Sequence, residues 1–439
     1  MSERLFLRGT LILTVTGLCS RLMGFFYRIF LSQAIGAQSM GIYQLAMPVQ
    51  GILMACTSIG IQAAIYRVCA SYTALGKEKE ARDCFFLGVS LSVLASVFLS
   101  FFLYQKAAFL SEQILKEPRT FPLLRILSFS FPLSALHSCI NSFFYSKKKT
   151  GLPAAILLLE QITRIGATYV LYLIFLSEKR EITASIAAGG ALFGELVACC
   201  VSLFTLGMDF SKAHYHIFKI SQKRLLFREI QKIAVPHSLN RLLLTLLSGM
   251  EMVLIPQRLQ LTGISASQAL GIYGVFTGMA LPLLLFPATV PNSLSVMLMP
   301  SVAGMQALGS NERIRTIASR TCTACFLFGG FFSAFFFLLG NPLGHFLFHS
   351  ETAGSYIRGL AFICPFLYAN TTLESILSGL GKTDSCLFHN VAGVCTRIAF
   401  VLFAIPRFGM HGYFHGILLS QLLLCFLHLR VLGSMIKKT

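Results

Sequence analysis

The chain has 439 residues, of which 55% are hydrophobic and only 12% are charged. With a mean hydropathy of +0.73, this composition excludes an ordinary soluble domain and indicates a polytopic helical membrane protein. The net charge of +19 could point to nucleic acid, but in a membrane protein it more often reflects cytoplasmic loops. The scattered cysteines are interpreted as buried hydrophobic residues and not as a disulfide framework.

Twelve apolar segments long enough to cross a bilayer follow one another along the chain. They lie at about 9–35, 42–66, 85–104, 121–145, 152–176, 184–207, 233–256, 270–300, 320–340, 357–380, 386–405 and 411–435. The first segment carries arginines and lacks a small-residue cleavage site, so it is interpreted as a membrane helix and not as a signal peptide.

Two arginines, Arg21 and Arg28, lie inside the first segment. They are seven positions apart, so on a helix they share nearly one face. An arginine at mid-membrane costs about 2.5–3.5 kcal/mol on insertion scales. The pair therefore predicts a water-filled cavity that holds an anion. Gly24, between them, is expected to let the helix bend and act as a gate hinge.

The charges outside the segments predict the orientation. When both termini are placed in the cytoplasm, the inner connections carry most of the lysines and arginines that lie outside the segments. The longest connection, 208–232, is basic and is expected to lie on anionic lipid headgroups. The predicted division is an N-terminal six-helix lobe at 1–207, this linker, and a C-terminal six-helix lobe at 233–439.

The two halves are similar in sequence. The tripeptide Gly-Ile-Tyr at 41–43 recurs at 271–273. Thr-Arg-Ile at 163–165 recurs at 396–398. The distance along the chain from the first copy to the second is thus almost the same for both tripeptides. Because each half has an even number of helices, the copies are predicted to be parallel repeats, with the substrate path between them.

Several acids and arginines lie inside the segments. Glu160 and Arg164 are one helical turn apart, so they are expected either to neutralise each other and stabilise packing or to take part in ion coupling. Arg397 has no acid one turn away, and it either pairs with Glu195 or Glu374 on another helix or lines the cavity.

Arg21 in the first half aligns with Arg241 in the seventh segment when the two halves are offset by somewhat fewer residues than the tripeptides require. The arginines predicted to bind an anion are Arg21, Arg28, Arg241 and Arg397, the alternative being structural capping of a broken helix. The candidates for a coupling site or a structural ion pair are Glu160, Arg164, Glu195, Glu251 and Glu374.

The sequence predicts no catalytic or metal site. The pairs His345/His349 and His411/His415 have helical spacing but no evident third ligand. There is no Walker A sequence, no nucleophile-plus-base pattern and no long soluble segment. The prediction is a transporter and not an enzyme, without a cofactor apart from a coupling ion, Na+ or H+.

Residues 20–28 read Ser-Arg-x-x-Gly-Phe-x-Tyr-Arg, and residues 41–48 read Gly-Ile-Tyr-Gln-Leu-Ala-x-Pro after Gly-Ala at 36–37. This pattern resembles the multidrug/oligosaccharidyl-lipid/polysaccharide (MOP, MATE-like) flippase superfamily, and within it the stage V sporulation protein B branch of polysaccharide exporters. The Ser-Arg-x-x-Gly-Phe core is also similar to that of the lipid II flippases, where the second arginine falls at the position of Tyr27. Members of these groups commonly have fourteen spans.

The resemblance implies a fold and a function. Two six-helix lobes would form a V around a central cationic cavity, which binds the pyrophosphate and sugar of an undecaprenyl-linked precursor while the lobes rock. The expected function is export of a cell-wall or polysaccharide precursor, lipid II or a sporulation-linked glycan among them, across the bacterial cytoplasmic membrane. The expected partners are this anionic lipid-linked glycan, anionic headgroups and the cell-wall synthesis machinery, and not nucleic acid.

Three alternatives stay open at this point. A cation- or proton-coupled multidrug antiporter of the same superfamily would use Glu195, Glu251 or Glu374. A membrane-embedded glycan polymerase would place catalytic groups on sizeable outer loops, whereas the outer connections are short. A scaffold without transport activity is compatible with the sequence.

Overall fold

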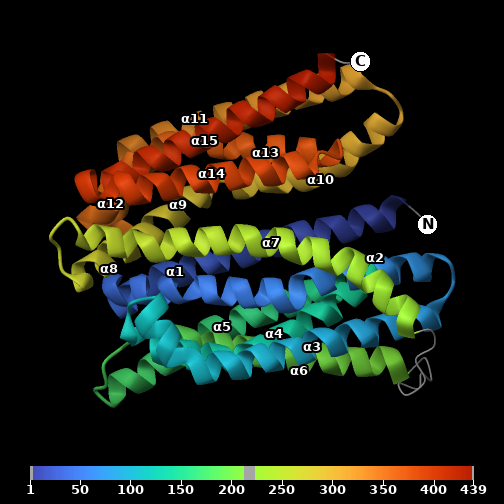
Figure 1. The fold of residues 1–439 in the computed structure, drawn as a ribbon, viewed down its shortest axis with the longest axis horizontal. Helices are drawn as coiled ribbons and strands as arrows, with labels where there is room; N and C mark the ends of the chain where they lie inside the picture. Colours follow the sequence, from blue (N-terminus) through green and yellow to red (C-terminus); the bar gives the residue numbers. More distant parts are fainter. Residues whose placement is uncertain (1–2, 212–222, 438–439) are drawn as a thin grey trace. The chain divides into compact units, whose positions relative to one another are not determined.

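The computed structural model describes residues 3–211 and 223–437, and every regular element in these residues is a helix (Figure 1). The part of the predicted linker at 212–222 lies outside the described residues. The helices of the first half are α1 (Glu3–Met54), η1 (Ala55–Ile59), α2 (Gly60–Ala74), α3 (Glu78–Phe109), η2 (Leu110–Ile114), η3 (Pro118–Thr120), α4 (Phe121–Ser146), α5 (Gly151–Ser177) and α6 (Ser185–Ser211).

The second half is also entirely helical in the described residues. Its helices are α7 (Lys223–Gln260), α8 (Ala266–Gly274), η4 (Val275–Ala280), α9 (Leu281–Leu285), α10 (Thr289–Ala307), α11 (Asn311–Phe348), α12 (Glu351–Leu360), η5 (Ala361–Ile363), α13 (Cys364–Gly379), α14 (Thr383–Phe403) and α15 (Ile405–Lys437).

By length and composition, 11 helical segments among the described residues can cross a membrane. The first, Thr14–Ala74, has 61 residues and would be about 90 Å long as one helix, three times the thickness of a bilayer core. It is broken at Gly36, whose φ of 75° and ψ of 169° suit only glycine. Counted on both sides of this break, the spans number twelve, as predicted. The all-α, multi-pass fold is thus confirmed, and the cytoplasmic location of the termini stays a prediction.

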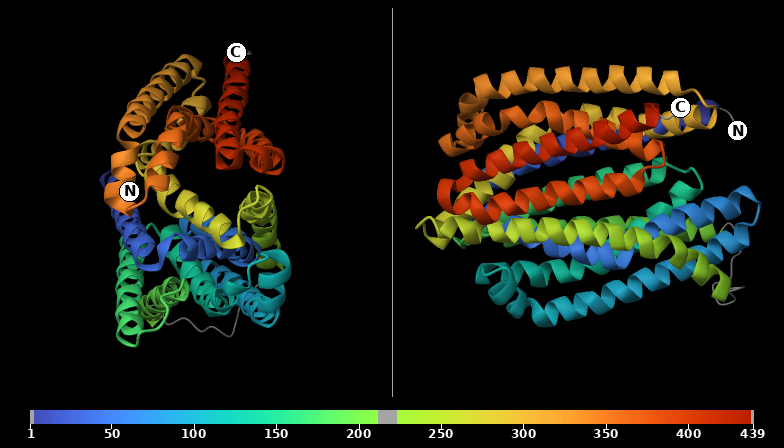
Figure 2. Two further views of the ribbon diagram at one scale, coloured as in Figure 1. Left: turned by 90° about the vertical axis from the view of Figure 1, so that its left-hand side faces the viewer. Right: turned by 45° about the horizontal axis from the view of Figure 1, so that its top comes forward.

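The packing divides the chain into two compact units. Unit 1 consists of Met1–Tyr27 and Ile42–Leu246, and unit 2 of Arg28–Gly41 and Leu247–Thr439. Both α1 and α7 therefore contribute residues to each unit. Within each unit the long helices follow a common direction, as the two views of Figure 2 show, which suits segments that cross the same bilayer. The predicted membrane lobes and their linker stay a prediction.

The core of unit 1 lies where α2, α3, α4 and the first half of α7 meet. Phe85 and Phe143 stack there with ring centroids 4.5 Å apart, and Ile230 of α7 is buried against the same cluster. Gly60 lets α7 approach closely, because a Cβ at this position would collide with the carbonyl oxygen of Ala234. Small residues at such contacts are typical of membrane helices, which associate through close van der Waals packing.

Unit 2 contains a second close helix contact. The segment Arg28–Gly41 crosses α8, and a Cβ at Gly274 would overlap the carbonyl oxygen of Ala37. A Cβ at Gly41 would in turn overlap the carbonyl oxygen of Leu270. The backbones therefore touch at Gly41, which begins the first copy of the repeated Gly-Ile-Tyr tripeptide, and at Gly274, which directly follows the second copy. Neither glycine has room for a side chain.

We expect Gly274→Ala to lower the stability of the protein by about 1–3 kcal/mol, the usual cost of overpacking. Gly271→Ala is the matched control, because a Cβ at Gly271 meets nothing within 4 Å and alanine favours a helix by about 0.5–1 kcal/mol. The chain lacks tryptophan but has many buried cysteines, so the Tm is measured in detergent with a thiol-reactive dye. Equal Tm values for the two variants would contradict the close contact.

Candidate functional site

Three of the four arginines predicted to bind an anion are exposed. Arg21 lies in α1 and Arg241 near the middle of α7, both in unit 1, while Arg28 belongs to the α1 segment of unit 2. Among the described residues, neither Arg21 nor Arg241 forms an ion pair with a carboxylate. Gly24 is helical in this conformation, and the break in α1 falls at Gly36. The anion-binding and hinge roles stay predictions.

The fourth arginine, Arg397 of α14, is held by an acid of α7. Its Nε and Nη2 donate hydrogen bonds to the two carboxylate oxygens of Glu251, at 2.7 and 3.0 Å. The hydroxyl of Tyr413 donates to the same carboxylate at 2.6 Å. Glu251 is buried, and this bidentate geometry with an additional donor is what a buried carboxylate requires.

The expectation that Arg397 pairs with Glu195 or Glu374 is therefore wrong. Its carboxylate partner is Glu251, 146 residues earlier in the chain. Glu374 instead accepts a hydrogen bond at 2.8 Å from the side-chain amide of Asn390, a neutral donor one helix away. The physical reason is that packing between α7, α14 and α15 decides the partner, and helical spacing says nothing about it.

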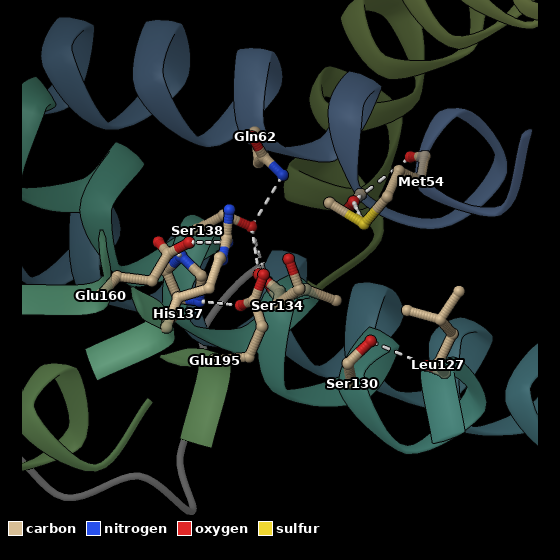
Figure 3. Close-up of polar contacts among 12 residues, drawn as sticks. Met54, Gln62, Leu127, Ser130, Ser134, His137, Ser138, Glu160 and Glu195 are labelled. Carbon is tan, nitrogen blue, oxygen red and sulfur yellow. Dashed lines mark hydrogen bonds and ion pairs between the residues drawn. The ribbon is translucent and has the colours of Figure 1, made fainter. Parts of the chain in front are cut away.

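Unit 1 contains a second buried ionic cluster, built on α4, α5 and α6 (Figure 3). Glu160 and Arg164 form the predicted ion pair one turn apart on α5. His137 of α4 lies between the carboxylates of Glu160 and Glu195: its Nδ1 is 3.0 Å from Oε2 of Glu195 on α6, and its Nε2 is 3.8 Å from Oε2 of Glu160. His137, Glu160 and Glu195 are each at most 7% exposed.

Polar contacts hold the helices around this cluster. The amide of Gln62 in α2 donates to Oγ of Ser138 at 2.8 Å, and that hydroxyl donates to the carbonyl oxygen of Ser134 at 2.5 Å. On the side of Arg164, Oγ1 of Thr168 donates to the arginine carbonyl oxygen at 2.8 Å and lies 3.1 Å from the hydroxyl of Tyr27. Contacts from α1 and α2 thus hold two of the three helices that carry the cluster.

Sequence reasoning missed His137, Tyr413 and Tyr27. A signal for His137 was present, because serines recur every four residues along the fourth segment and mark a polar face on an otherwise apolar helix. These serines are Ser130, Ser134, Ser138, Ser142 and Ser146. His137 lies beside this face. Within the described residues, no group of three His, Cys, Asp or Glu side chains has the arrangement of a metal site.

Comparison with known proteins places the chain in a family. The chain matches the polysaccharide biosynthesis protein family over residues 6–298. It is 27% identical to stage V sporulation protein B of Bacillus subtilis over 98% of this chain and 83% of that protein. It is 25% identical to the lipid II flippase MurJ of the same organism over 48% of this chain and 40% of that protein.

Among solved structures, an inward-facing multidrug resistance MATE family transporter of the MOP superfamily superimposes with a TM-score of 0.74. The two chains are 16% identical, and the match covers 96% of each. Fold and spans together define a multi-pass membrane protein with the fold of the MATE transporters. The protein belongs to the polysaccharide biosynthesis protein family. The family and the fold support a membrane flippase or exporter.

Proposed function

We propose that this protein moves an undecaprenyl-pyrophosphate-linked precursor of the cell wall or of a polysaccharide across the bacterial cytoplasmic membrane by alternating access. One observation carries the proposal. Of the arginines inside the spans, Arg164 and Arg397 are paired with acids, whereas Arg21 and Arg241 are exposed and form no ion pair among the described residues. Membrane proteins retain such cations where they face water or an anionic ligand.

The charge balance favours an anionic substrate. A diphosphate brings roughly two negative charges, which two arginines would compensate while it is away from bulk water. An inside-negative potential releases about 2.3 kcal/mol per charge and 100 mV as an anion moves outward. The membrane potential alone could therefore drive export, without nucleotide hydrolysis.

One relative supports this substrate class, since it is named a lipid II flippase. A multidrug antiporter would need an acid free to bind a cation. Glu251 is already saturated by Arg397 and Tyr413, and Glu160 is paired with Arg164.

The saturation of Glu251, together with the exposed Arg21 and Arg241, which form no ion pair within the described residues, favours the anionic lipid over a cationic drug. Glu195 is the remaining candidate acid, because its Oε2 has no aligned hydrogen bond among the described residues. Anionic headgroups at the basic connections and the cell-wall machinery complete the proposed partners.

Reconstitution into liposomes tests the proposal. We expect flipping of fluorescent lipid II, or of another undecaprenyl-pyrophosphate-linked glycan, and we expect its rate to rise when a potential pulls the anion toward the opposite leaflet. The controls are protein-free liposomes and a cationic dye as alternative substrate. Transport of the dye alone would support the antiporter, and transport of neither by folded protein would support a scaffold.

A further inference from the structure

His137 lies between two carboxylates, so the number of protons on its ring decides how many of them it can donate to. Nδ1 faces Glu195 at 3.0 Å and Nε2 faces Glu160 at 3.8 Å. A neutral imidazole carries one N–H, so it can direct a proton at only one of these carboxylates, and its other nitrogen then turns a lone pair toward the second. An imidazolium ion carries a proton on each nitrogen, so it directs one at Glu195 and the other at Glu160, where the distance of 3.8 Å is that of an ion pair. The geometry is therefore complete only after one additional proton is bound.

The charges of the cluster also indicate that one additional proton is bound. With both glutamates ionised and Arg164 positive, a neutral His137 leaves one uncompensated negative charge among buried groups. One bound proton makes the cluster neutral, and an isolated charge in such surroundings is expensive. Oε2 of Glu195 and Nδ1 of His137 also have no aligned hydrogen bond among the described residues, although both side chains are more than nine-tenths buried.

The ionic cluster of unit 2 differs in this respect. Glu251 receives three hydrogen bonds from Arg397 and Tyr413, so its charge is matched without a further proton. In the register that aligns the two Thr-Arg-Ile tripeptides, the position in unit 2 that corresponds to His137 is Asn370, whose amide bonds Gln421 at 2.8 Å. At the position of His137, unit 2 thus has an amide, which does not titrate.

We propose that His137, Glu160 and Glu195 form a proton-loading site in unit 1, which takes up one proton on the imidazole and releases it when the surrounding helices separate. The other groups around the ring are compatible with this role. Arg164 of α5 faces Glu160, and Cys199 of α6 lies one turn after Glu195. Tyr27 of α1 bonds Thr168, while α2 supplies the uncharged Gln62.

If the proposed transport is correct, this site would link it to a proton gradient. If one proton is bound from one compartment and released to the other in each transport cycle, a difference of one pH unit changes the ratio of substrate on the two sides of the membrane about tenfold. Between uptake and release the proton is bound to a ring nitrogen of His137 or to a carboxylate oxygen. The step is therefore a proton transfer only and needs no other reactant.

Two readouts test the site, one of which does not depend on transport. In purified protein with isotope-labelled histidine, the infrared spectrum of the wild type minus that of His137→Gln isolates the ring of His137. Spectra are recorded from about pH 8 to about pH 5, the range in which histidine side chains serve as proton switches. We expect the imidazolium signal of this ring to grow as the pH is lowered and to be weaker in Glu195→Gln. The exposed His237 of α7 supplies the control variant His237→Gln.

In proteoliposomes, a pH gradient should change the final ratio of fluorescent lipid II between the two leaflets about tenfold per pH unit in the wild type and in His237→Gln. It should have no effect in His137→Gln. A ring of His137 that stays neutral over this range, or a gradient response in His137→Gln equal to the wild type, would overturn the site. Flipping without any gradient response would also overturn it, while the proposed function would stand. A ring that takes up the proton in protein that moves no substrate would leave the site standing and contradict the function.

Discussion

Arg21→Ala and Arg241→Ala are each expected to reduce flipping of an undecaprenyl-pyrophosphate-linked substrate by about 10- to 100-fold. This range corresponds to the loss of one charge-assisted hydrogen-bonding group, worth about 1.5–3 kcal/mol. Both side chains are exposed and form no ion pair among the described residues. Their removal should therefore leave the fold and the Tm unchanged. The Tm is measured on the same preparations that are used for the flipping assay.

Two further variants make this expectation specific. Arg21→Lys keeps the charge but loses the planar fork, so its flipping should lie between the alanine variant and the wild type. Arg407→Ala removes another exposed arginine, at the beginning of α15, and should flip like the wild type. Wild-type rates in both alanine variants, or equal losses in Arg407→Ala, would exclude an anion site at these two positions.

The second large effect is expected on stability. Glu251→Ala leaves Arg397 without a counter-charge among buried groups, and breaking a buried ion pair in this way costs about 3–5 kcal/mol. The hydroxyl of Tyr413 also loses its acceptor. We expect the Tm of Glu251→Ala, followed with a thiol-reactive dye, to fall far more than that of any arginine variant above.

The double variant Glu251→Met/Arg397→Met separates charge from packing. Removing both charges abolishes the desolvation cost, so the double variant should be more stable than Glu251→Ala alone. If the losses of stability in Glu251→Met and Arg397→Met simply add up in the double variant, the pair contributes through packing and not through its charges.

The number and order of the spans could be predicted from the sequence, because a bilayer requires about twenty apolar residues for each crossing. The pair Glu160–Arg164 could be predicted for a similar reason, since its spacing is one helical turn. The pair Arg397–Glu251 could not. Its members lie 146 residues apart, and only the packing of α7 against α14 brings them together.

His137 and Gly36 illustrate two other limits. The sequence does not single out His137, because a single histidine in an apolar segment is usually a satisfied core residue and its two acids come from separate helices. Gly24 was favoured as the bend because it lies between two arginines. The positive φ of the backbone is found at Gly36, and several glycines in the first half are equally able to adopt it.

The division of α1 between the units has a consequence for biosynthesis. Residues 28–41 belong to unit 2, yet they leave the ribosome long before Leu247–Thr439, the segment with which they pack. They are therefore inserted before their packing partners exist, and unit 1 in turn is incomplete until Leu246 has been inserted. Neither unit can therefore mature as an independent translation product, and the order of insertion is part of how this chain reaches its native structure.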